Sequence, residues 1–162
     1  MGDTLRQIGE NCRNQKVRIG ILENATTEDG KQVAEYAAYN EYGTRHIPPR
    51  PFMRLTIGQH KEDWVRTFVG MIQNQNLQDP SVIERAFTMV GVQAVGHIQE
   101  TIDSNVPPPN ADSTRRRKQK VITGANGKVM KDSGGEAMTH IPVTLVMNGT
   151  MRKAIAFEVN RE

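Results

Sequence analysis

A long amphipathic stretch at residues 81–103 constrains the fold of this chain most strongly. Its apolar residues recur every fourth position, at Val82, Ala86, Val90, Ala94, Ile98 and Ile102. This period predicts an α-helix with one broad buried face. Ser81 and Glu84 fit a capping box at its start. At 1.5 Å per residue the helix measures roughly 35 Å, so the rest of a small domain must pack along it.

Shorter patterns predict the remaining elements. Val17, Ile19 and Ile21 alternate with polar residues or glycine, as in a strand with one buried face. We expect helices at 3–15, 32–42 and 60–75, and strands at 16–22, 143–147 and 154–159. The expected fold class is α+β, with a small antiparallel or mixed sheet, helices on one face, and a long extended arm or hairpin.

The length and composition predict a single domain, 1–162, with a thin core. Of the 162 residues, 36% are hydrophobic and only 5% are aromatic. A Pro-rich, then basic, then Gly-rich segment at about 104–142 is much longer than an ordinary loop. It contains Asn126-Gly127, a pair typical of hairpin turns. We therefore expect a long Pro/Gly-rich basic arm at 104–142.

Residue types that carry catalysis or bind cofactors form no recognisable pattern in this sequence. The four histidines are scattered without metal-ligand spacing, and the single cysteine, Cys12, excludes an intramolecular disulfide. Cys12 lies on the apolar face of the first predicted helix, so we expect it in the core. The sequence predicts no enzyme, no catalytic or metal residue and no cofactor. It also contains no apolar run long enough for a membrane span, and from its polar first ten residues we expect no signal peptide.

The sharpest charge feature is the run Arg115, Arg116, Arg117 and Lys118, in a chain whose net charge is only +3. Three interpretations stay open: a solvated part of the arm, a docking element for an acidic surface of another subunit, or a contact with DNA phosphates. The DNA interpretation lacks a base-stacking platform, because no aromatic residue lies between 88 and 156.

The segment 34–54 is the most specific feature, because a helix with tyrosines leads into a stiff proline corner at 43–52. Prolines fix such a corner in advance and lower the entropy cost of binding. The candidate subunit-interface residues are Tyr42, Arg50, Pro51, Phe52 and Arg54. The alternative is that Phe52 fills the core and the prolines only turn the chain.

Three motifs resemble the minor tail and neck proteins of long-tailed bacteriophages, the tail-completion or virion-morphogenesis group. The first is N-E-Y-G-T followed by I-P-P-R-P-F-M-R, within 40–54. The second is Pro107–Pro109 with the basic stretch from Ser113 to Lys118. The third is PVTLVMNGTMRKAI at 142–155, where Asn148 departs from the Asp-Thr pair that is usual before the glycine. The resemblance covers about residues 16–159.

The resemblance implies a structural virion protein rather than an enzyme. Such proteins are similar to ring-forming subunits of the head–tail junction, or neck, which join tail to head and let genomic DNA pass. Six copies are preferred and twelve are possible beside a portal. The implied partners are portal or head–tail adaptor proteins and tail tube, sheath or terminator proteins. The implied location is the virion neck, with the host cytoplasm during assembly.

Two alternatives are kept open beside this interpretation. Within the same neck, the chain fits a tail terminator or a collar or head-closure protein. In a different class, it fits a small DNA-binding accessory protein that uses Arg115–Lys118, whose DNA affinity would be sensitive to salt and lost when those residues are neutralised.

Overall fold

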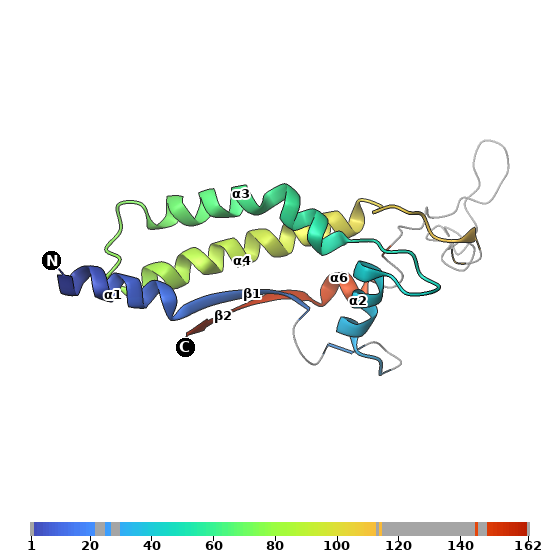
Figure 1. Ribbon diagram of the computed structural model, residues 1–162, viewed down its shortest axis with the longest axis horizontal. Coiled ribbons are helices and arrows are strands. Elements are labelled where there is room, and N and C mark those ends of the chain that lie inside the picture. Colours follow the sequence, from blue (N-terminus) through green and yellow to red (C-terminus); the bar gives the residue numbers. More distant parts are fainter. Residues whose placement is uncertain are drawn as a thin grey trace, which may run out of the picture.

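Two long helices and a two-stranded ribbon form the body of the molecule. The computed structural model describes residues 2–21, 25–26, 30–112, 114, 145 and 149–161. Its elements are α1 (Gly2–Arg13), β1 (Gln15–Ile21), α2 (Val33–Tyr42), α3 (Phe52–Ile72), α4 (Pro80–Asp103), α6 (Thr150–Lys153) and β2 (Ile155–Arg161). In Figure 1, α4 lies between α3 and the ribbon, with α1 at one end of the long axis and α2 and α6 towards the other.

The sheet is a two-stranded antiparallel ribbon of β1 and β2, which with the helices makes a small α+β fold as expected. Val17 pairs with Val159, Ile19 with Phe157 and Ile21 with Ile155. Alternation puts these apolar pairs on one face of the ribbon, and both strands pack against α4. Of the third strand expected at 143–147, only Leu145 is described, and it lies in a bend with its side chain in the core.

Helix α4 confirms the apolar stripe that its sequence predicts. Its buried positions are Val82, Ile83, Ala86, Val90, Gly91, Ala94, Ile98, Thr101 and Ile102. The predicted capping box is wrong, because the helix begins earlier. Asp79 is the N-cap and accepts a hydrogen bond from the Ser81 backbone N–H at 2.9 Å, and Pro80 takes the first helical position. An Asp cap followed by proline leaves no capping role for Ser81.

Helix α3 differs from its prediction in its start and in its packing. It begins at Phe52 rather than 60, and it packs on α4, on the side away from the ribbon, rather than on the sheet (Figure 1). Polar pairs cross this contact: Trp64 Nε1 donates to His97 Nδ1 at 3.0 Å, and Thr67 Oγ1 donates to Gln93 Oε1 at 2.8 Å. Only the first two turns of α3 contain buried residues.

The main core lies towards the α2 end of the molecule. It joins residues of α2, α3, α4, α6, β2 and two loops: Val33, Ala37, Phe52, Ile98, Ile102, Val106, Leu145, Met151 and Ile155. Because Val106 belongs to this core, the start of the segment expected to be an arm is part of the packed domain. Most of that segment, with Asn126-Gly127, lies outside the described residues. Cys12 is exposed, contrary to its expected place in the core.

The ribbon and α4 are in close contact at Gly91. A Cβ atom at this position would lie 2.3 Å from Cδ2 of the Phe157 ring, well inside van der Waals contact. The ring therefore packs directly on the backbone of the helix. No residue with a side chain fits at 91 unless the ribbon or the ring moves.

We expect Gly91→Ala to lower the free energy of unfolding by about 1–3 kcal/mol, because it overpacks the contact with Phe157. Gly96→Ala is the matched control in the same helix, where an added Cβ meets no atom within 4 Å. That change should raise stability by up to about 1 kcal/mol, the helix-propensity difference between the two residues. Urea denaturation of both variants measures the effect, and equal stabilities would contradict the close approach.

Candidate interaction surface at the junction of α2 and α3

A carboxylate from α2 caps the start of α3. Pro51 stands at the N-cap position and offers no side-chain acceptor. Glu41 takes this role: its Oε2 accepts from the Met53 N–H at 2.9 Å, and its Oε1 accepts from the Arg54 N–H at 3.2 Å. These are the amide groups that an N-cap side chain normally satisfies, and a negative charge is favoured there by the helix dipole. The start of α3 therefore depends on the end of α2.

Arg54 closes the same junction from the outside. Its Nε lies 2.9 Å from Glu41 Oε1, and its Nη2 donates to the Glu41 backbone carbonyl at 2.9 Å. The guanidinium also lies over the ring of Tyr42, 5.2 Å from the centroid, within the range of a cation–π contact. Glu41 is only 4% exposed, so Arg54 neutralises a buried carboxylate.

The corner between the two helices is held by glycine and threonine. Gly43 ends α2 with φ 78°, and a Cβ atom there would lie 2.9 Å from the Ile47 carbonyl oxygen. This confirms the predicted helix end at glycine. The Thr44 N–H donates to the Ile47 carbonyl at 2.8 Å. Its hydroxyl oxygen accepts from the backbone N–H groups of His46 and Ile47, so the loop is a closed turn.

Arg50 lies inside the molecule rather than on its surface, contrary to its predicted place in an interface. Its backbone N–H donates to the Asn40 carbonyl at 2.6 Å. Its side chain donates to the carbonyls of Pro108 and Pro109, at 2.8 and 3.2 Å. Burial lowers the pKa of Arg50, and the guanidinium remains a cation because its ordinary pKa is so high. Arg50 therefore ties the loop after α4 to the corner.

Phe52 is a core residue, and this corrects its prediction as an interface residue. Its side chain is 1% exposed and packs in the main core. Pro51 is half-buried. Of the predicted interface residues, Tyr42 and Arg54 are therefore the two exposed at the junction. The run Arg115, Arg116, Arg117 and Lys118 lies outside the described residues.

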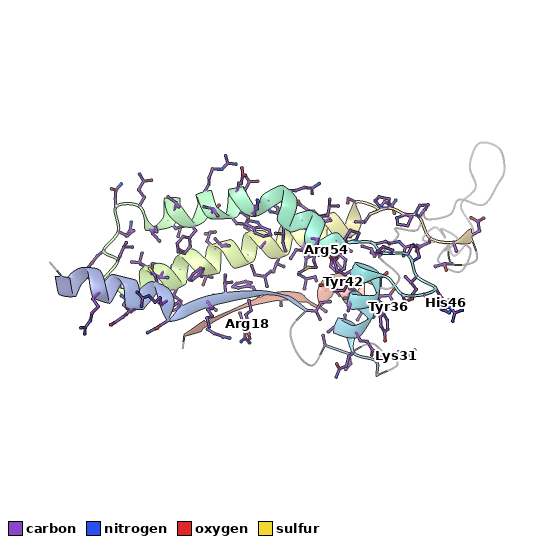
Figure 2. All side chains as sticks on the ribbon, viewed as in Figure 1. Arg18, Lys31, Tyr36, Tyr42, His46 and Arg54 are labelled. Carbon is purple, nitrogen blue, oxygen red and sulfur yellow. The ribbon has the colours of Figure 1, made fainter. Side chains whose placement is uncertain are left out.

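Three tyrosines of α2 form the exposed surface that this junction supports, and we call them the tyrosine face: Tyr36, Tyr39 and Tyr42. Tyr42 is the most open, at 70% exposure. The Tyr39 hydroxyl donates to the Glu35 carboxylate, and this hydrogen bond raises the pKa of Tyr39. Figure 2 places Tyr42 beside Arg54, with Tyr36 and His46 at the same end of the molecule.

No family model, curated protein or solved structure matches this chain. The phage resemblance therefore depends on the sequence motifs alone. Among the described residues, no group of three His, Cys, Asp or Glu side chains is placed to hold a metal ion. Within the same residues, no helix has the length and hydropathy needed to cross a bilayer.

The sequence interpretation missed Glu41 as the key residue of the junction. The available signal was a helix after Pro51 with no Ser, Thr, Asp or Asn to cap it. Glu41, ten residues before Pro51, supplies the missing acceptor because the corner folds the end of α2 back onto the start of α3. The periodicity of the sequence does not reveal this fold-back.

We expect Glu41→Gln to lower the free energy of unfolding by about 2 kcal/mol, since it removes the buried charge that accepts hydrogen bonds from α3. Amide hydrogen exchange at Met53 and Arg54 should accelerate. Glu62→Gln, at an exposed position of α3, is the control and should change stability by less than about 0.5 kcal/mol. Equal losses in the two variants would contradict the capping role.

Phe52→Ala should lower the free energy of unfolding by about 3–5 kcal/mol, as expected for a truncated core aromatic. Leu55→Ala, about one turn further along the same helix at a partly exposed position, should cost less. Thermal or urea denaturation of the purified variants measures both. A folded Phe52→Ala protein with unchanged stability would instead support the original interface prediction.

Proposed function

We propose that this chain is a structural virion protein of the bacteriophage head–tail junction, a ring-forming tail-completion or connector subunit. One observation carries the proposal: the motif on which the resemblance depends corresponds to a single interlocked junction. Within it, Glu41 caps α3, Gly43 permits the corner, Arg50 binds the loop after α4, and Phe52 enters the core. Residues of the motif that depend on one another in this way support the proposal, because the motif acts as one unit of the fold.

The surface at this junction supports a role in assembly. Tyrosine offers a large, rigid contact area at low cost in side-chain entropy, and it is enriched in protein interfaces. The tyrosine face lies next to a corner already fixed by Gly43, Thr44 and the prolines. Binding therefore loses little conformational entropy of the backbone there. Exposed Val65 and Val69 on α3 add further apolar surface that a neighbouring subunit would cover.

The proposed partners follow from this role. They are further copies of the chain in a ring, portal or head–tail adaptor proteins on one side, and tail tube, sheath or terminator proteins on the other, with genomic DNA in the lumen. A tail terminator or a collar or head-closure protein of the same neck fits the same surface. Which of these neighbours the subunit contacts would decide its position among the layers of the neck.

Cryo-electron microscopy of phage particles whose genome encodes this chain tests the proposal, with symmetry imposed around the tail axis. We expect a ring of density between portal and tail into which α3, α4 and the ribbon fit. Absence of the chain from the particles would contradict the proposal. The DNA-binding alternative would then be supported if affinity for DNA falls with salt and is lost when Arg115–Lys118 are neutralised.

A further inference from the structure

We propose that His60 and His97 form a pH-sensitive latch between α3 and α4, which holds while His97 is neutral and opens when acid protonates it. The two imidazole rings stack, with their centroids 3.8 Å apart and their planes inclined by 26°. One ring comes from α3 and the other from α4, far apart in the sequence. Such a latch would operate whether or not the chain belongs to a virion.

His97 holds Trp64 only in its neutral form. The Trp64 indole N–H donates to His97 Nδ1 at 3.0 Å, and the planes of the two rings are 18° apart. An indole nitrogen only donates, whereas both nitrogens of a protonated imidazole carry hydrogen. A proton on His97 Nδ1 therefore removes the acceptor and sets N–H against N–H. The Trp64 N–H then lacks this partner in a half-buried contact, which costs free energy.

His60 is placed to take the first proton. Its Nδ1 is buried and has no hydrogen-bond partner within the described residues, and Asp63 Oδ2 lies 3.5 Å away. A proton at this atom gives the carboxylate a cationic partner, which favours the charged ring. A second proton, on His97, would stack two cations that repel each other. The pair therefore accepts one proton readily on His60, and the second proton breaks the contact.

The charged groups around the pair support this order. On α3, Asp63 is paired with Arg66, and this hydrogen bond lowers the pKa of Asp63. Its carboxylate therefore stays ionised in the range where histidines gain a proton. On α4, Glu100 follows His97 by three positions and is exposed, so its charge is screened by solvent. The ribbon lies across α4 from α3, and its charged side chains belong to that other side (Figure 1).

The second half of α3 is the element that the latch controls. The buried residues of α3 lie in its first two turns. Beyond them, half-buried side chains make the contact with α4, including the Thr67–Gln93 hydrogen bond and the tilted rings of Phe68 and Phe87. Segments with so little buried surface open at low free energy without global unfolding. Acid should therefore release the second half of α3 while the main core stays folded.

Fluorescence of the purified full chain from about pH 8 to about pH 5, the range in which histidine titrates, tests the latch. Trp64 is the single tryptophan of the sequence, so its emission reports on this contact alone. We expect the emission to move to longer wavelength as the pH falls, because the indole leaves a half-buried contact for water. His97→Gln keeps an oxygen acceptor and does not titrate in this range, so it should show no transition.

Two further histidine variants separate the pair from a general effect of acid. His46→Gln, at an exposed histidine of the corner, is the matched control and should titrate like the unaltered chain. His60→Gln should keep the transition and shift it to higher pH, because no neighbouring cation then opposes the proton on His97. Circular dichroism at the starting pH confirms that each variant is folded.

Amide hydrogen exchange, expressed as protection factors, locates the opening. At the acid end we expect roughly tenfold loss of protection at Val65 and Val69, as for one lost hydrogen bond, while Ile98 keeps its protection. Trp64→Phe has no N–H to lose, so its acid-induced loss should be smaller. Flat fluorescence in the unaltered chain, a His97→Gln transition like that of the unaltered chain, or a Trp64→Phe loss of the full size would each overturn the inference.

Discussion

The packing of other elements around α4 is the constraint on which the rest of the structure depends. A two-stranded ribbon is at best marginally stable by itself in water, and here β1 and β2 gain a core only by packing along α4. Gly91 makes this possible, because the Phe157 ring occupies the space that a side chain would fill. Helix α3 depends on α4 in the same way, through a contact that is partly polar at Thr67 and Gln93.

The junction of α2 and α3 depends on a different interaction, the burial of one carboxylate at a helix start. Glu41 replaces a side-chain cap that Pro51 does not offer, and Arg54 neutralises it. The conspicuous motif of the sequence thus serves mainly to build this junction. Arg50 and Phe52, which the proline corner made candidate interface residues, are interior. The surface available to a partner at this junction is the tyrosine face.

Elements with a strong local pattern were predictable, and elements fixed by distant partners were not. The alternation in β1 and β2 and the stripe in α4 were confirmed, because burial on one face imposes a period on the sequence itself. The start of α3 was placed eight residues late, because its cap comes from another helix. Cys12 was placed in the core from periodicity alone, yet α1 makes few contacts with α4 and leaves the thiol exposed.

The sequence by itself determined the α+β class, the long central helix, the glycine end of α2 and the proline corner, since each follows from period or from the restricted dihedral angles of glycine and proline. Only the tertiary structure decided which side of the corner is buried. Arg50 finds carbonyl acceptors near residue 108, and Phe52 finds a core built from four helices and β2. These partners lie far from Arg50 and Phe52 in the chain, so they leave no local pattern in the sequence. Whether a residue of this motif is buried or exposed is therefore decided only in the folded molecule.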